Sequence, residues 1–379
     1  MRYLKFLSVF FLGSVISACT PEPEIQPENA IPVDAQQHIQ QAEQEIAEAE
    51  VEVAAFESDW ISPRMTVTVP AGSVDALADA IAEAGPGGTV ILETGEHVES
   101  APVVIEQRVK IEGEDGALLL FPNALEPQGI PMEVEASLHI RNTSRVWLKN
   151  FGLLTGIDQA GRIGVQIQNA PRTRLESLHI TSFQYGVLLD GGNRCQFIDN
   201  TLVGIYADYP NIANWGLTNS TGQRSIMMRN TISGFAVGVF FSDRNSLAFS
   251  NTLIGMDIGM LWCTVAPWQA YPDGTVIAAA EPARGCRAYN NLAVANLWSY
   301  LVIDGARSSV LIQNESVEPV LYDIELAPAS ERFGFPTPTS TNSLVISVGN
   351  YIDYSIKDCT GDNTIIGGVL VDTDVDICF

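Results

Sequence analysis

Three aspartates occupy similar places in a sequence that repeats itself, and their type and spacing suit acid–base chemistry. Each closes a short apolar run: Asp190, Asp243 and Asp304. If these runs stack as turns of one coil, carboxylates on alternate turns would lie ~10 Å apart. That distance is near the upper end of the ~6.5 to 9.5 Å that separates the carboxyl groups in inverting hydrolysis of a sugar. The three are therefore the catalytic candidates, although Asp also closes turns for structural reasons, which is the favoured explanation.

Arginines recur a few residues after the same runs, in a chain whose formal net charge is -25. The recurring set is Arg145, Arg172, Arg194, Arg224, Arg244 and Arg307. A guanidinium binds a carboxylate or a sulfate through two parallel hydrogen bonds, so a stacked row would suit successive charges of an acidic polysaccharide. All except Arg145 are therefore candidate substrate-binding residues. Pairing with nearby aspartates on an exposed corner is the favoured alternative.

Aromatic residues gather in long insertions between the repeats, near residues 204–214, 262–290 and 322–342. Insertions on a rigid scaffold often carry function. Aromatic faces pack well against the C–H faces of sugar rings. Trp262, Trp268 and Tyr271 are therefore further candidates for contact with substrate, or they fix their own loops to the scaffold.

Other chemistries have little support in the sequence. The four histidines, His38, His97, His139 and His179, fall in separate segments, so we expect neither a shared metal site nor a cofactor. We find no glycine-rich phosphate loop and no nucleophile elbow. The acidic charge disfavours a nucleic-acid partner.

A repeating scaffold must position these candidates. Each repeat opens with a short apolar or alternating strand and carries a second mark about a dozen residues later. The second marks are Asn150, Ser177, Asn200, Asn230, Asn251 and Asn314. A turn of three short strands cannot bury its inward side chains without neighbours stacked ~4.8 Å away. Asn tolerates the left-handed backbone of a sharp corner, and its amide can bond to the equivalent amide one turn away.

We therefore predict an all-β fold, a right-handed parallel β-helix with rungs of three strands, over residues 65–379. A β-sandwich is the rival fold, but the hairpin turns that it requires are hard to find. Residues 66–113 run as a strand, a short helix behind Ser73, a Gly85-Pro86-Gly87-Gly88 turn and further strands. This order is typical of an N-terminal cap.

Thr66 to Gly113 and the Asn-marked repeats from Leu138 to Asn314 resemble the pectin-lyase-like β-helix superfamily. The resemblance implies the fold rather than an activity, because the superfamily includes polysaccharide lyases, glycoside hydrolases and uronan epimerases. Neither the Gly-His-Gly motif of galacturonan hydrolases nor the Asp-Pro-His-Asp motif of alginate epimerases is present.

The N-terminus resembles that of an exported bacterial lipoprotein. Residues 1–18 combine a basic start, an apolar core and small residues before Cys19, which resembles a lipobox and implies acylation of Cys19. We expect a chain held in the cell envelope by this lipid alone, at the outer membrane if the host has two membranes. Residues 19–64 are an acidic tether, with a helix predicted over 35–56. Its thin apolar stripe suits a spacer rather than an oligomerisation zipper.

Export permits disulfides. Cys263 and Cys286 bracket one insertion, and Cys359 and Cys378 bracket the last turn, so we predict these two pairs and leave Cys195 as a buried apolar residue.

Three functions remain open. The first is a lipid-anchored envelope protein that binds a polysaccharide along the coil. The second is a polysaccharide lyase or glycoside hydrolase that uses the aspartates. The third is a non-catalytic scaffold for a protein partner whose identity the sequence does not indicate.

Overall fold

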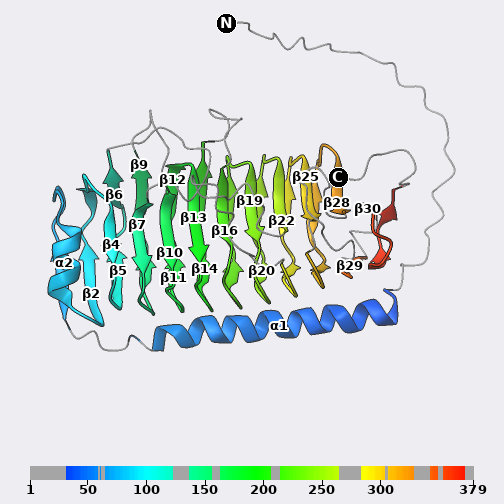
Figure 1. Ribbon diagram of the computed structural model, residues 1–379, viewed down its shortest axis with the longest axis horizontal. Coiled ribbons are helices and arrows are strands. Elements are labelled where there is room, and N and C mark those ends of the chain that lie inside the picture. The colour runs from blue at the N-terminus through cyan, green and yellow to red at the C-terminus, as the bar shows by residue number, and fades with distance from the viewer. Residues whose placement is uncertain are drawn as a thin grey trace, which may run out of the picture.

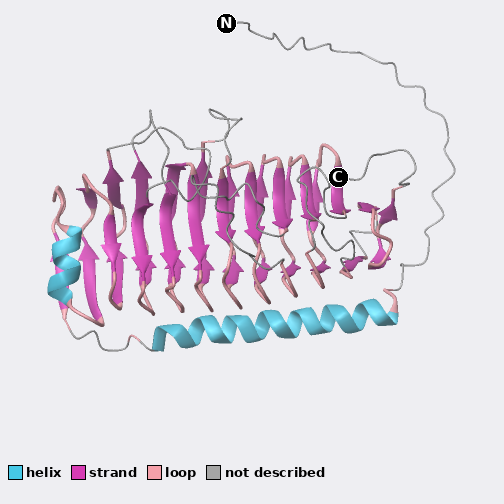
Figure 2. Ribbon diagram, in the orientation of Figure 1, coloured by secondary structure: helices cyan, strands magenta, loops and turns pink. Residues whose placement is uncertain are grey.

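The computed structural model describes residues 31–58, 60, 65–122, 136–155, 163–205, 214–263, 283–303, 306–327, 342–348 and 353–371. Within these residues the strands form three sheets in which every neighbouring pair is parallel (Figures 1 and 2). From residue 88 to residue 326 the chain visits the three sheets in turn, with one strand to each per rung, and its last four strands alternate between two of the sheets. The predicted parallel β-helix is therefore confirmed.

We number the sheets in the order in which the chain meets them. Sheet 1 contains β1 (Thr66–Val69), β2 (Gly88–Leu92), β5 (Val109–Gly113), β8 (Trp147–Lys149), β11 (Arg174–Glu176), β14 (Gln196–Ile198), β17 (Ile226–Met228), β20 (Leu247–Phe249), β23 (Arg287–Tyr289), β26 (Val310–Ile312), β29 (Leu344–Ser347) and β31 (Thr364–Gly367). Sheet 2 contains β3 (Gly95–Val98), β6 (Ala117–Phe121), β9 (Gly152–Thr155), β12 (His179–Phe183), β15 (Thr201–Gly204), β18 (Thr231–Ser233), β21 (Thr252–Ile254), β24 (Leu292–Val294) and β27 (Glu315–Val317). Sheet 3 contains β4 (Val103–Ile105), β7 (Ala136–Arg141), β10 (Ile163–Gln168), β13 (Tyr185–Asp190), β16 (Trp215–Asn219), β19 (Val237–Phe241), β22 (Ile258–Trp262), β25 (Trp298–Val302), β28 (Tyr322–Leu326), β30 (Ser355–Asp358) and β32 (Val369–Leu370).

The interior of the coil is a continuous apolar core. Alternate side chains of each strand point inward, as in β5, where Val109, Ile111 and Gly113 are buried while Lys110 and Glu112 are half-buried. Equivalent residues of successive rungs are in register, so Val187, Leu217 and Val239 follow one another in the core. Each rung thus buries its inward side chains only because it lies between two others.

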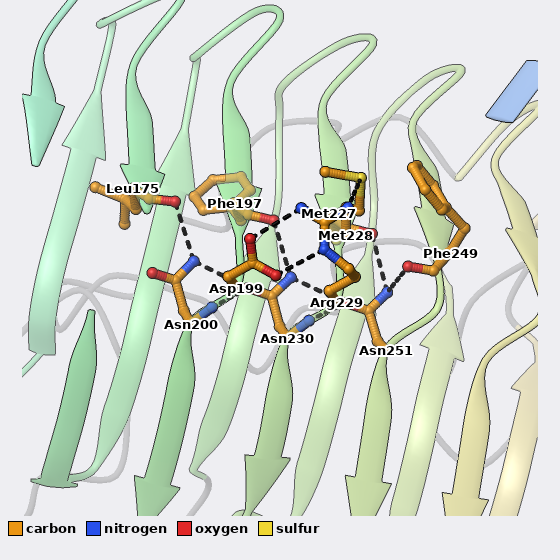
Figure 3. A network of polar contacts seen from close by, with 10 residues as sticks. All are labelled: Leu175, Phe197, Asp199, Asn200, Met227, Met228, Arg229, Asn230, Phe249 and Asn251. Carbon is orange, nitrogen blue, oxygen red and sulfur yellow. Dashed lines mark hydrogen bonds and ion pairs between the residues drawn. The ribbon is translucent and has the colours of Figure 1, made fainter. Parts of the chain in front are cut away.

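The corner between sheets 1 and 2 carries an asparagine ladder. Asn200 Nδ2 donates to Asn230 Oδ1 at 2.9 Å, and Asn230 Nδ2 donates to Asn251 Oδ1 at 2.9 Å (Figure 3). The predicted amide stacking is confirmed. The predicted left-handed backbone is confirmed at Asn150 (φ 57°) and Ser177 (φ 53°), whereas at the corners of the ladder it falls one residue earlier, at Asp199 (φ 55°) and Arg229 (φ 54°). The ladder asparagines point inward and satisfy buried backbone carbonyls instead.

The N-terminal cap of the coil is the short helix α2 (Leu77–Ala84), which begins three residues later than a helix capped by Ser73 would begin. The Ser73 cap was a wrong prediction, because no side chain of the helix start bonds to the first turn. Glu99 supplies that bond from the neighbouring rung, where its Oε1 accepts from Leu77 N at 2.9 Å. Gly85 ends the helix with φ 66°, which is a left-handed value that suits glycine.

The long helix α1 (Val33–Ser58) covers the outer face of sheet 1 along most of the coil (Figure 1). The helix itself was predicted, but its role as a free spacer was wrong. Ala35, Ile39, Ala42, Ala49 and Val53 are buried against the sheet. Their partners are outward apolar side chains of the strands: Ile198, Ile226, Met228, Leu247, Phe249, Tyr289, Ile312 and Ile346.

Several predicted segments are narrower than expected or lie outside the described residues. β23 and β28 fall within the insertions expected at 262–290 and 322–342, so those insertions are shorter. Most of 204–214, together with residues 264–282 and 328–341, lies outside the described residues, as do the predicted signal peptide and Cys19. None of the described helices is long and apolar enough to cross a membrane.

Candidate arginine groove

The corner between sheets 3 and 1 carries four of the predicted arginines, one per rung. Arg145, Arg172, Arg194 and Arg224 each lie two residues before a strand of sheet 1, and all have left-handed backbone, with φ between 56° and 58°. Arg172 N donates to Asn193 O and Arg194 N to Gln223 O, both at 2.8 Å, which fixes the stacking. We call this set the arginine row.

The backbone does not favour arginine at these positions. A left-handed conformation costs a residue with a side chain about 1 to 2 kcal/mol, and glycine or asparagine meets it most easily. Later rungs do place Asn245 (φ 58°) and Gly285 (φ 67°) at the equivalent position. Four successive arginines therefore point to a use for the side chain rather than for the turn.

The predicted single column of arginines is two rows. Arg244 and Arg307 lie one position earlier than the arginine row, where isolated bridges align Gln223, Arg244, Arg284 and Arg307 on successive rungs. Arg284 was missed by the sequence analysis because it fell inside an expected insertion. Neither Arg284 nor Arg307 lines the groove described next.

A groove of about 440 Å³ lies between the arginine row and the C-terminal part of α1. Arg172, Arg194 and Arg224, all exposed, form one wall. The other residues around it are Gln196, Glu52, Ala55, Phe56 and Ser58. A second hollow of about 440 Å³ continues along the helix between Arg224, Asn245 and Arg287 on the coil and Glu45, Glu48 and Glu52 on α1.

The helix wall of the groove is held firmly in place. Arg174 on β11 is buried, and its Nη1 donates to Val53 O at 2.8 Å while its Nε lies 2.8 Å from Glu176 Oε2. Phe56 meets Trp147 edge to face, with ring centroids 5.6 Å apart. A buried guanidinium that bonds to the last turns of a helix also offsets the partial negative charge there. The groove is therefore preformed rather than created by a moving segment.

The lining of the groove suits a sugar acid. Three guanidinium groups can bind carboxylates or sulfates. Glu52, Ser58 and Gln196 offer acceptors and donors for hydroxyl groups, and Phe56 offers an aromatic edge.

Asp243 lies inside the coil, where no polymer can reach it. Its side chain is buried and accepts from Asn219 Nδ2 at 2.6 Å and from Cys286 Sγ at 3.1 Å, and it contacts Ser246 Oγ. Burial, only partly offset by these bonds, raises the pKa of Asp243 to about 7. Burial and the nearby Asp243 carboxyl also raise the pKa of the Cys286 thiol. This cluster is a structural polar network of the interior.

The expected row of carboxylates is not formed by the described residues. Asp190 is half-buried, in register with Gln168, and accepts from Thr221 Oγ1 at 2.8 Å. Asp243 lies two residues beyond Phe241, one step further along its rung than Asp190. The two therefore do not lie in one row, and Asp304 lies outside the described residues.

The three aromatic residues predicted to contact substrate do not line the groove among the described residues. Trp262 is a core residue that stacks on Phe241, with ring centroids 5.2 Å apart, so its assignment to substrate was wrong. Trp268 and Tyr271 lie outside the described residues. The aromatic residue that does line the groove, Phe56, was missed because it belongs to the segment that was taken for a tether.

One of the two predicted disulfides is wrong. Cys263 and Cys286 are buried thiols, and Cys286 instead donates to Asp243. Cys195 is buried as predicted. The pairing of Cys359 with Cys378 stays a prediction, because Cys378 lies outside the described residues.

Solved structures of the same architecture resemble this chain at low sequence identity. The alginate lyase of Paenibacillus sp. str. FPU-7 has a TM-score of 0.51 at 11% identity, over 81% of this chain and 98% of the lyase. The A-module of a mannuronan C-5 epimerase from Azotobacter vinelandii has a TM-score of 0.52 at 13% identity, over 81% and 95%. An endo-xylogalacturonan hydrolase from Aspergillus tubingensis has a TM-score of 0.54 at 12% identity, over 80% and 92%.

No family model matches the chain, and no curated protein matches its sequence. The likeness is therefore one of fold. This chain has the right-handed parallel β-helix fold of the pectin-lyase-like proteins.

Proposed function

We propose that this chain is a lipid-anchored protein of the cell envelope that binds an acidic polysaccharide in the groove between α1 and the arginine row. The observation that carries the proposal is the placement of Arg172, Arg194 and Arg224 on successive rungs, all lining one preformed groove. Charges repeat every ~4.8 Å along such a row. A linear polymer with an anionic group on each sugar presents its own charges in a comparable series.

The three similar structures support a polysaccharide as the ligand, but they do not support any one reaction. Their names refer to alginate, mannuronan and xylogalacturonan, which are polymers that contain sugar acids. Binding rather than catalysis is proposed because Asp243 is buried in the core and, among the described residues, Asp190 has no second carboxylate next to it in the expected row. The anchor rests on the sequence around Cys19 alone.

The proposal is tested by measuring the affinity of the purified body for oligomers of uronic acids, first on a glycan array and then by calorimetry. We expect Arg194→Ala with Arg224→Ala to weaken binding at least ~30-fold, since charge-assisted hydrogen bonds contribute about 1.5 to 3 kcal/mol each and the groove is partly open to solvent. Added salt should weaken the native interaction further.

The matched control is Arg307→Ala with Arg284→Ala. This variant removes the same charge from the same corner but from outside the groove. It should bind nearly as well as the native chain. Equal losses in both double variants would mean that net charge rather than the groove holds the polymer, and the proposal would then be abandoned.

A further inference from the structure

The contacts of α1 fix its direction along the coil. Near the helix end, Val53 O bonds to Arg174 on β11 and Phe56 packs on Trp147 of β8. Nearer the helix start, Glu45 accepts from Tyr289 Oη of β23 at 2.8 Å. The helix therefore runs opposite to the order of the rungs, and Val33 lies at the C-terminal end of the coil (Figure 1).

The helix length agrees with this alignment. Its 26 residues span about 39 Å at ~1.5 Å each, which is roughly eight rung spacings of ~4.8 Å. The start of α1 consequently lies at the end of the coil where β31 and β32 are, and not beside the α2 cap.

The chain between Cys19 and Val33 is short compared with the coil. The thirteen residues between them, four of which are proline, give fourteen steps, which reach about 43 Å as a polyproline II chain and about 50 Å at full extension. The 12 strands of sheet 1 span about 53 Å. A lipid on Cys19 could bring the α2 cap to the membrane only if this segment ran back along the whole coil fully stretched, which costs conformational entropy.

The same end of the coil exposes apolar side chains. Val320 and Leu321 precede β28 with exposed fractions of 67% and 47%, while Val369 and Leu370 of β32 are 51% and 63% exposed. Val320 N and Leu321 N bond to the preceding rung, at Asn296 O and Leu297 O. These four residues, which we call the terminal apolar patch, belong to the last rungs that the structure describes.

We propose that the C-terminal end of the coil rests on the lipid surface in which Cys19 is anchored, with the terminal apolar patch against the bilayer and the α2 cap pointing away. This inference rests on the lipid anchor of the proposed function. Apolar side chains gain about 25 cal/mol per Å² when they leave water for the interface. The arginine row then runs along the membrane normal, and the groove lies several rungs above the lipid.

The coil is not expected to lie on its side with the α1 face against the membrane. The solvent side of α1 carries exposed carboxylates with no exposed Lys or Arg between Val33 and Ser58. Anionic headgroups would repel that face. The face covered by α1 is therefore not the surface that meets an anionic bilayer.

The test uses the full chain, produced with its own signal in a bacterium that processes lipoproteins and reconstituted into vesicles of phosphatidylethanolamine and phosphatidylglycerol. A fluorophore is attached through a non-thiol handle at Asp353, near the patch, or at Asp79 on α2, both of which are exposed. Energy transfer to an acceptor lipid should be strong from Asp353 and weak from Asp79. Equal transfer from both, or stronger transfer from Asp79, would overturn the inference.

Two variants separate the patch from the anchor. Val320→Asp with Leu370→Asp should lower transfer from the Asp353 label at least twofold without detaching the protein. Val74→Asp is the matched control, since Val74 is 62% exposed at the opposite end, and it should change nothing. Association of detergent-free chains through the patch, seen by sedimentation and lost in the double variant, would instead assign the patch to a second copy and overturn the inference.

Failure of the inference and of the proposed function can be told apart. Mass spectrometry of the N-terminal peptide reports the lipid on Cys19, and a chain without it overturns both the anchor and the orientation. A lipidated chain with the wrong transfer pattern overturns the orientation alone. Oligouronate affinity of the same samples reports the groove independently.

Discussion

At the scale of single residues, the burial of Asp243 determines the protonation state of its carboxyl group. Among the described residues it forms no salt bridge, and its hydrogen-bond partners are Asn219, Ser246 and Cys286. Such an environment favours the neutral acid, because a buried charge without a counterion is costly. The three donors to Asp243 come from its own rung and from the rungs on either side, so the cluster links adjacent rungs.

This environment predicts a pH-dependent stability. The pKa of Asp243 rises from 3.8 to about 7 on folding. Its contribution to the free energy of unfolding is therefore fully present below pH 4 and is lost as the pH rises to about 7. The full loss is on the order of 4 kcal/mol. We expect Asp243→Asn to remove this dependence. In denaturant unfolding, the free energy of unfolding of the variant should therefore increase relative to that of the native chain from pH 5 to pH 8. Parallel curves for the two proteins would contradict an uncharged Asp243.

At the scale of elements, α1 is an added layer on sheet 1 rather than part of the coil. Its apolar side chains recur every seven residues in two series, Ala35, Ala42 and Ala49 beside Ile39, Ile46 and Val53. The same pattern would serve a zipper, a spacer or a docked helix. The sequence therefore predicts the helix and its buried stripe but not the surface that receives it.

The docking of α1 is tested by substituting a residue within the stripe. Val53 is 7% exposed, and Val53→Asp buries a carboxylate in place of an apolar side chain, at a cost of roughly 2 to 4 kcal/mol. We expect the amides of 33–58 to lose protection from hydrogen exchange while the strands keep theirs. Val51 is 70% exposed, so Val51→Asp should leave the exchange pattern unchanged. Protection of α1 that survives Val53→Asp would mean that the stripe does not hold the helix.

The repeat was predictable for a physical reason that the groove does not share. Asn200, Asn230 and Asn251 recur because each corner poses the same backbone problem, and that recurrence is visible in one dimension. The groove joins Arg194 to Phe56, whose positions in the chain are far apart and show no common pattern. Of the residues that line the groove, the sequence predicted only the arginines, as candidate substrate-binding residues.

At the scale of the whole molecule, the coil supplies a straight scaffold and α1 supplies the second wall of a site along it. The predicted column of aspartates is not formed by Asp190 and Asp243, because they occupy different steps of their rungs, and Asp304 lies outside the described residues. The groove beside the arginine row gives the proposed binding a defined place to be tested. A formal net charge of -25 also means that the arginine row is a local basic feature in an acidic protein.

The central claim is that the arginine row holds an acidic sugar polymer, and the most direct measurement is a titration followed by NMR of the arginine Nε–Hε groups. A uronic-acid trimer added to the protein should shift the signals of Arg172, Arg194 and Arg224 together, with a single dissociation constant. The signals of Arg284 and Arg307 should stay in place. Shifts spread equally over all five, or confined to the last two, would contradict the assignment of the groove as the binding site.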